Sequence, residues 1–225
     1  MTVMATQCLM FAELEPDSTL DFPVPLSDKY KPERVSDFAG LTEVKKVLAG
    51  FVARPTSAGF LFYGPAGSGK TSMGYALANE VQGFVHHVRA GDCSVKTIND
   101  TVFSCWHCAP PGYKRHVVIV DEIDRSTEAT QYSLLSYLDG TETVPDTVWI
   151  FTSNEVDQLP AKFTSRCRPL KFGNYGIQED AAALLERVWK SESASPVPNC
   201  ARIIKENLGN VRAALMALEM KLYAA

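Results

Sequence analysis

Long hydrophobic runs are missing from this sequence of 225 residues, and no apolar stretch approaches the length of a membrane span. The N-terminal residues 1–17 lack a basic leader, and Thr and Gln interrupt their apolar residues, so they make a poor signal peptide. An excess of positive charge is also missing, since the net charge is −4. This balance argues against a surface that binds nucleic acid everywhere and leaves room only for a local basic patch.

Internal repeats and low-complexity tracts are absent as well. The six cysteines, at positions 8, 93, 105, 108, 167 and 200, are not needed as disulfides in a chain of this size, which favours reduced thiols inside a cell. We therefore expect an intracellular protein without a membrane partner: cytoplasmic, nuclear in a eukaryote, or in the host cytoplasm if viral.

Apolar runs alternate with helical patterns through the first three quarters of the chain. Buried strands are expected at 59–64, 116–124 and 147–154, a further strand at 84–88 and a short extended segment at 168–172. Helices are expected at 41–53, 70–82, 95–108 and 127–140, the last closed by Gly140. This alternation predicts an α/β fold with a parallel sheet covered by helices on both faces.

Strand patterns stop near residue 175, and only helical patterns follow, at 179–192, 201–207 and 211–224. The sequence thus predicts three parts. Residues 1–28 form an extended or partly disordered lead-in, residues 29–174 an α/β nucleotide-binding core, and residues 175–225 a small all-α part.

The stretch "GPAGSGKT" matches the phosphate-binding P-loop, or Walker A, pattern. Glycines let the backbone N–H groups wrap a phosphate, Lys70 offers a cation to the β and γ oxygens, and Thr71 offers a hydroxyl to Mg²⁺. The predicted nucleotide-binding residues of this loop are Gly64, Pro65, Ala66, Gly67, Ser68, Gly69, Lys70 and Thr71. A Gly-rich turn with an incidental lysine is the structural alternative.

The stretch "VVIVDEID" reads as a buried strand that ends in acids, the Walker B pattern. Asp121 is predicted to hold the metal, directly or through water, and Glu122 to polarise the attacking water. The alternative is that these acids at the end of the strand are only solvated and have no catalytic role. Together, the two motifs predict an ATPase that uses ATP and Mg²⁺.

At this point the chain resembles the AAA+ ATPases, and within them clamp-loader subunits of the replication factor C small-subunit type, from about residue 27 to 222. The resemblance implies a P-loop AAA+ core followed by a helical lid. It places Tyr30, Pro32 and Val35, in "LSDKYKPERVSDFAG", beside the adenine. Asn154, in "TSN", falls at the first sensor and would orient the water near Glu122.

The same resemblance assigns two arginines. Arg212, in "GNVRAALMALE", falls at the second sensor and would face the phosphates of its own nucleotide. Arg166, in "SRC", falls at the arginine finger, which reaches the γ-phosphate bound by a neighbouring subunit. No carboxylate lies within five residues of Arg166, which fits a finger used in trans. A surface arginine satisfied by a distant carboxylate is the alternative.

The resemblance implies a subunit of a homo- or hetero-oligomer that hydrolyses ATP to load a sliding clamp on primer-template DNA. Clamp-loader subunits continue into a helical collar domain, for which this sequence has no counterpart. A compact AAA+ remodeller or loader, viral or mobile-element encoded, acting on another protein–DNA complex is therefore the second reading. A third interpretation is a scaffold subunit that binds nucleotide without hydrolysing it. The presence of Lys70, Asp121 and Glu122 argues against this interpretation.

Three further features stay open. Lys96 and the helix that begins near Ser94 are candidates for DNA phosphate contacts. Gln131 is either a link between DNA and the Walker B acid or a solvated side chain. Cys105 and Cys108 have C-x₂-C spacing, with Cys93, His107 and His116 nearby, but no second clean pair completes a zinc motif, which favours buried thiols. His86 and His87 are expected to alternate between core and surface.

Overall fold

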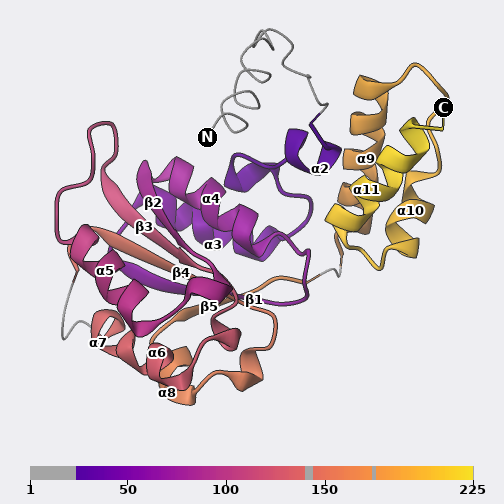
Figure 1. Ribbon diagram of the computed structural model, residues 1–225. Helices are drawn as coiled ribbons and strands as arrows, with labels where there is room; N and C mark the ends of the chain where they lie inside the picture. The colour runs from indigo at the N-terminus through magenta and orange to yellow at the C-terminus, as the bar shows by residue number, and fades with distance from the viewer. Residues whose placement is uncertain (1–23, 140–143, 174–175, 225) are drawn as a thin grey trace, which may run out of the picture.

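The computed structural model describes residues 24–139, 144–173 and 176–224, and a five-stranded sheet lies at the centre of its larger part (Figure 1). The strands are β1 Ala58–Tyr63, β2 Gly83–Val88, β3 Arg115–Val120, β4 Thr147–Ser153 and β5 Arg168–Lys171. They pair in the order β2-β3-β4-β1-β5, and every pair is parallel. All carboxyl ends therefore meet at one edge, where sheets of this kind place their ligands.

Helices cover both faces of the sheet, as predicted. On one face α3 (Thr42–Ala53) and α4 (Lys70–Glu80) pack in an apolar cluster that includes Leu77 and Ile119. On the other, α5 (Val95–Cys105) and the short helices α7 (Leu135–Leu138) and α8 (Ala161–Thr164) share a cluster with Val118, and α6 (Glu128–Ser133) contacts α5. Neighbouring β3 residues thus point to opposite faces, and burial on both explains why residues 117–120 are all apolar.

Short 3₁₀ turns connect these elements. They are η1 Val35–Asp37, η2 Ala90–Asp92, η3 Ile123–Arg125 and η4 Val156–Gln158. Among them, η3 is the next element after β3, and Asp121 and Glu122 lie between the two at the carboxyl edge of the sheet.

The C-terminal helices form a separate bundle beside the sheet (Figure 1). They are α9 Gln178–Glu192, α10 Cys200–Glu206 and α11 Val211–Leu222, and they pack around a cluster of their own that includes Leu185 and Leu218. Asparagine side chains cap two of these helices: Asn199 accepts from Arg202 N, and Asn210 accepts from Ala213 N. We call this bundle the lid.

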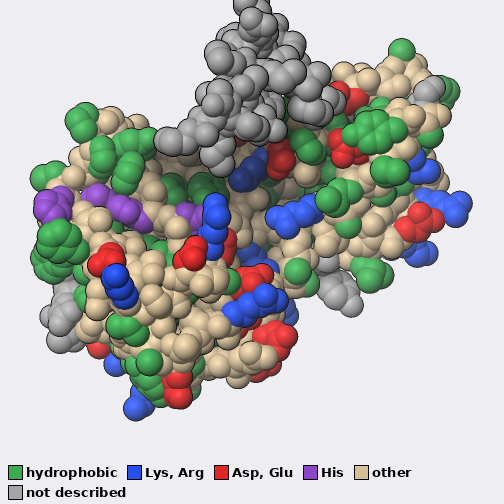
Figure 2. Space-filling view, viewed as in Figure 1, with side chains coloured by type: hydrophobic (Ala, Val, Ile, Leu, Met, Phe, Trp, Pro, Cys, Tyr) green, Lys and Arg blue, Asp and Glu red, His purple; other side chains and the backbone are tan. Residues whose placement is uncertain are grey.

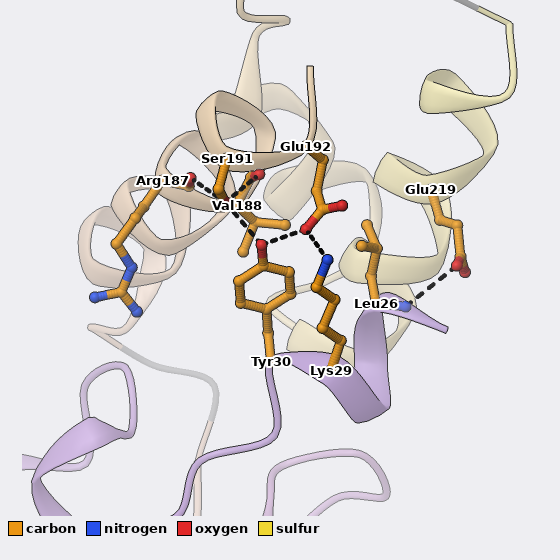
Figure 3. A network of polar contacts seen from close by, with 8 residues as sticks. All are labelled: Leu26, Lys29, Tyr30, Arg187, Val188, Ser191, Glu192 and Glu219. Carbon is orange, nitrogen blue, oxygen red and sulfur yellow. Dashed lines mark hydrogen bonds and ion pairs between the residues drawn. The ribbon is translucent and has the colours of Figure 1, made fainter. Parts of the chain in front are cut away.

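A short helix from the start of the described chain is attached to the lid. In α2 (Leu26–Lys29), Leu26 is buried in the lid cluster, and its backbone N–H donates to Glu219 Oε1 at 3.1 Å. Lys29 Nζ lies 2.8 Å from Glu192 Oε1, and the Tyr30 hydroxyl bonds both Ser191 and Glu192 (Figure 3). The segment that precedes the core in sequence therefore joins it to the lid.

The predicted α/β architecture is confirmed, and the differences are local. Residues 26–28 are helical rather than extended, whereas the rest of the predicted lead-in up to residue 23 lies outside the described residues. The predicted helix 127–140 is two short helices, α6 and α7, that meet at buried Leu134. Gly140 and the predicted core–lid boundary at 174–175 also lie outside the described residues.

The helix predicted at 95–108 ends at Cys105, five residues before Pro110. A proline disfavours helical backbone at the residue before it, so Pro110 keeps the helix from extending to Ala109. In the described parts of the chain, no helix combines the length and apolar character that crossing a membrane requires.

Candidate nucleotide-binding site

The glycine-rich loop joins β1 to α4 at the carboxyl edge of the sheet. Gly64, Gly67 and Gly69 have φ of 146°, 75° and 89°, in the region that side chains disfavour. A Cβ on Gly64 would lie 1.9 Å from the Phe172 carbonyl oxygen, and one on Gly67 would lie 2.4 Å from Asn210 Nδ2. The loop thus needs glycine both for its conformation and for its close neighbours.

Lys70 is the first residue of α4 and is buried. Its Nζ donates to the carbonyls of Gly64 and Pro65, at 2.8 and 2.9 Å, and to Asn154 Oδ1 at 2.9 Å. Burial lowers the pKa of Lys70, while the carboxylates of Asp124, Glu122 and Asp121 oppose that shift. These acceptors hold the ammonium group against the inside of the loop, where it faces the acids.

Asp121 lies directly after β3, and its carboxylate accepts hydrogen bonds from threonine hydroxyls of two other elements. Its Oδ1 accepts from Thr71 Oγ1 at 2.8 Å and from Thr152 Oγ1 at 2.9 Å. Its Oδ2 lies 2.7 Å from His87 Nε2, at the end of β2. A carboxylate oxygen beside a threonine hydroxyl is the kind of oxygen ligand pair that suits Mg²⁺, so Thr71 and Asp121 fit the predicted metal site.

Glu122 has a left-handed backbone, with φ of 49°, which is strained for a residue with a side chain. Its N–H donates to Thr152 Oγ1 at 2.9 Å, which holds this conformation. The carboxylate accepts from Asn154 Nδ2 at 3.4 Å and pairs with Arg125 at 3.1 Å. The predicted catalytic acid and the predicted first-sensor asparagine are therefore neighbours.

Two cavities meet at this edge. The larger, about 370 Å³, lies between core and lid, and its lining includes Tyr30, Pro32, Phe38 and Leu215. The smaller, about 270 Å³, is lined by polar groups of the site. They are Lys70, Thr71, Asp121, Glu122, Asn154 and Arg212, together with other loop residues. The larger, partly apolar cavity suits the base of a nucleotide, and the smaller, charged cavity suits its phosphates.

Besides Gly64 and Pro65 of the loop, two predicted site residues line neither cavity. Val35 is buried in the core cluster under α3 and α4, and its N–H donates to Glu80 Oε1 at 3.0 Å, so it lines neither cavity. Arg166, just after α8, also lines neither cavity. The Arg166 guanidinium is therefore not part of its own chain's pocket.

In the isolated chain Arg166 pairs with a distant carboxylate, as the alternative interpretation of this residue expected. Its Nε lies 3.3 Å from Asp139 Oδ2, and its Nη1 donates to the Lys162 carbonyl at 2.8 Å. Asp139 is distant in sequence, at the end of α7, so only the folded chain brings the two side chains together. About a third of the Arg166 side chain remains exposed, at 33%.

Gln131 and Lys96 have contrasting environments. Gln131 is buried in α6, and its Nε2 donates to the carbonyls of Ile123 and Ser126, at 3.0 and 3.3 Å. The solvated alternative for Gln131 is thus wrong, and its amide fixes the turn that follows Glu122. Lys96 is exposed on the first turn of α5, which Ser94 caps.

Three contact residues were not among the predicted site residues. His87 and Thr152 bond Asp121, and Asn210 Nδ2 donates from the lid to the Ala66 carbonyl at 3.3 Å. The predicted strands carried a usable signal for the first two, because parallel strands that end together bring their last residues to one edge. Asn210 was detectable only as a helix cap.

The prediction of buried thiols holds for four of the described cysteines and is wrong for Cys108. Cys93, Cys105, Cys167 and Cys200 are buried free thiols, and burial raises the pKa of both Cys105 and Cys167 to about 12. Cys108 is exposed, so the C-x₂-C pair does not share one environment.

Comparison with known proteins agrees with this geometry. Residues 60–173, about half of the chain, match the ATPase family associated with various cellular activities (AAA). Replication factor C small subunit 1 of Pyrobaculum islandicum is 29% identical over 201 residues, which is 86% of this chain and 60% of that protein. Replication factor C subunit 4 of Homo sapiens is 27% identical over 212 residues, 88% of this chain and 58% of that protein.

The replication factor C small subunit of Halobacterium salinarum is 27% identical over 165 residues, and this chain spans about half of it, 51%. Among solved structures, the RuvB Holliday junction branch migration motor of Thermotoga maritima superposes with a TM-score of 0.72 at 20% identity. That match covers 84% of this chain and 64% of RuvB, and it supports the fold alone. The sequence match, the parallel sheet and the P-loop agree, and the chain belongs to the AAA family of ATPases.

Proposed function

We propose that the protein is an ATP-hydrolysing subunit of a clamp-loader-type assembly, which acts with other AAA+ subunits to place a sliding clamp on primer-template DNA. One observation carries the ATPase part of this proposal: Lys70, Asp121, Glu122 and Asn154 line one cavity beside the lid. The replication factor C relatives, matched over most of this chain, support the replication part.

The residues divide the work of hydrolysis. Lys70 and the loop N–H groups bind the phosphates, and Thr71 and Asp121 would hold Mg²⁺, which supplies positive charge to the phosphate oxygens. Glu122 accepts a proton from the attacking water, and Asn154, 3.4 Å from it, orients that water. The lid contributes Arg212, which lines both cavities and would face the phosphates of a nucleotide bound by the same chain.

Arg166 serves a neighbouring subunit in this proposal. It lines neither cavity of its own chain and lies partly exposed beside α8. Its contact with Asp139 is an exposed ion pair, a class that contributes only about 0–1 kcal/mol, so exchange for a γ-phosphate costs little. A finger of this kind accelerates hydrolysis by about 10³–10⁵-fold in related nucleotidases.

The test is the response of ATP hydrolysis to the proposed clients. We expect the assembled protein to bind a sliding clamp in the presence of ATP and to hydrolyse ATP faster when clamp and primer-template DNA are both present. The Lys70→Ala variant serves as the control and should show neither response. If a well-formed oligomer fails to capture a clamp and is not stimulated, clamp loading is wrong, and stimulation by another protein–DNA complex would favour the compact remodeller.

A further inference from the structure

Three chemically reactive side chains converge on the face of the sheet that α5 covers, away from the nucleotide site. They are His86 of β2, Cys105 at the end of α5 and His116 at the start of β3. One nitrogen of each imidazole and the Cys105 sulfur all lie within 4.8 Å of one another. In the part of the chain that the structure describes, this is the only group of three such side chains that meets this spacing.

The fold fixes the positions of all three residues. The strands β2 and β3 pair in parallel, with Phe84 opposite His116 and His86 opposite Val118. Since alternate residues share a face, both histidines point toward α5, where Val118 is buried. Cys105 is buried at the last turn of α5, and this helix places its sulfur against the two histidines.

The hydrogen bonds of His116 leave one nitrogen available as a ligand. Its Nε2 lies 2.9 Å from the His107 carbonyl oxygen, which can only accept, so Nε2 carries the proton. Its Nδ1 therefore presents a lone pair, and it points at His86 Nε2, 2.9 Å away. A histidine that donates its other N–H to a backbone carbonyl is the usual arrangement behind a metal ligand.

We propose that His86, Cys105 and His116 form a binding site for a soft divalent transition-metal ion, of which Zn²⁺ fits best. Imidazole nitrogen and thiolate sulfur are the donors that Zn²⁺ prefers. Bonds of about 2.0–2.1 Å to nitrogen and about 2.3 Å to sulfur place tetrahedral ligand atoms roughly 3.3–3.7 Å apart. The two imidazoles thus need to separate by only about 0.4 Å from their present contact.

Binding of the metal ion releases one proton from Cys105 and moves another between the nitrogens of His86. The Cys105 thiol releases its proton to solvent as the sulfur–metal bond forms, and the proton shared by the imidazoles moves to the far nitrogen of His86. Water completes the coordination, since the protein supplies three ligands. The aromatic ring of Phe84 packs edge-on at 5.0 Å from His86, and Figure 2 shows histidine side chains beside hydrophobic ones on one face of the molecule.

The ligand set differs from a Cys105–Cys108 pair. Cys108 is exposed and does not belong to the group, whereas His86 comes from a strand about twenty residues upstream of the helix end. The three ligands come from β2, β3 and α5, so a bound ion would hold these elements together at the outer edge of the sheet.

Titration of the metal-free full chain with Co²⁺, a coloured substitute for Zn²⁺, tests the proposal. We expect about one ion per chain with the near-ultraviolet band of a thiolate–cobalt bond, displaced by Zn²⁺. Cys105→Ser should abolish the band and His86→Gln should weaken binding at least tenfold. Cys108→Ser, the matched thiol control, should keep both band and affinity.

Several results would overturn the site: no Co²⁺ or Zn²⁺ binding by the wild-type chain, a band that survives Cys105→Ser, or a band lost in Cys108→Ser. Circular dichroism shows whether each variant folds, and if Cys105→Ser does not, the half-buried His86→Gln decides. Crystals of the wild-type protein grown with Zn²⁺ give an independent answer. Anomalous density at the zinc edge between the three side chains supports the site, and its absence there contradicts it.

Discussion

Glu122 is the residue on which water activation depends in the proposed reaction. Its strained backbone is held by Thr152, and its carboxylate meets Asn154. Glu122→Gln keeps the size and shape of the side chain but removes the proton acceptor, so we expect hydrolysis to fall by about 10²–10⁴-fold while ATP still binds. Single-turnover hydrolysis and equilibrium nucleotide binding measure the two effects separately, and equal losses in both would contradict the role.

Substitution of Lys70, unlike that of Glu122, should weaken ATP binding itself. Its ammonium group is buried and faces the acids of the site, so Lys70→Ala removes the cation that the phosphates meet. We expect ATP affinity to fall at least tenfold, measured with a fluorescent nucleotide. Lys96→Ala, which changes an exposed lysine on α5, is the control and should leave affinity unchanged. Unaltered affinity in Lys70→Ala would contradict the phosphate site.

At the scale of elements, the turn after β1 depends on Gly64. A Cβ there would lie 1.9 Å from the Phe172 carbonyl oxygen, and φ of 146° adds strain. We expect Gly64→Ala to lower the free energy of unfolding by at least about 2 kcal/mol, measured by denaturant titration. Gly91→Ala, where a Cβ has nothing within 4 Å, should stay within about 0.5 kcal/mol of the wild type.

The attachment of α2 to the lid gives a second prediction at this scale. Leu26 is buried in the lid cluster, so Leu26→Ala should cost about 2–5 kcal/mol in the unfolding of the lid. Met216→Ala on α11, whose side chain is exposed, should change stability by no more than about 0.5 kcal/mol. Equal effects of the two substitutions would show that α2 does not pack on the lid in solution.

The sequence was sufficient for features that short segments determine. The strands follow from continuous apolar runs, and the phosphate loop and the acids after β3 follow from local motifs. Contacts between distant segments were not predictable in the same way. The helix α2 has four residues and depends on its contacts with the lid, and Asp139 meets Arg166 only after α7 and α8 pack on one face of the sheet. Such pairs depend on tertiary packing, which no local pattern encodes.

At the scale of the whole molecule, the proposed phosphate site and the proposed arginine finger lie at separate places on one chain. Lys70 and Glu122 line the cavity, whereas Arg166 does not. This separation supports a proposed catalytic unit that consists of two neighbouring subunits. A neighbour's Arg166 would complete the site around the triphosphate.

The most direct test mixes two inactive variants, Arg166→Ala and Glu122→Gln, after mass measurement confirms that they assemble together. Each variant alone should hydrolyse ATP at a small fraction of the wild-type rate. In a random equal mixture, about one quarter of the interfaces pair an intact Glu122 with an intact Arg166 from the neighbour, so the account predicts recovery of up to about one quarter of wild-type hydrolysis. No recovery in confirmed mixed assemblies, or full-rate hydrolysis by a monomer of the wild type, would contradict it.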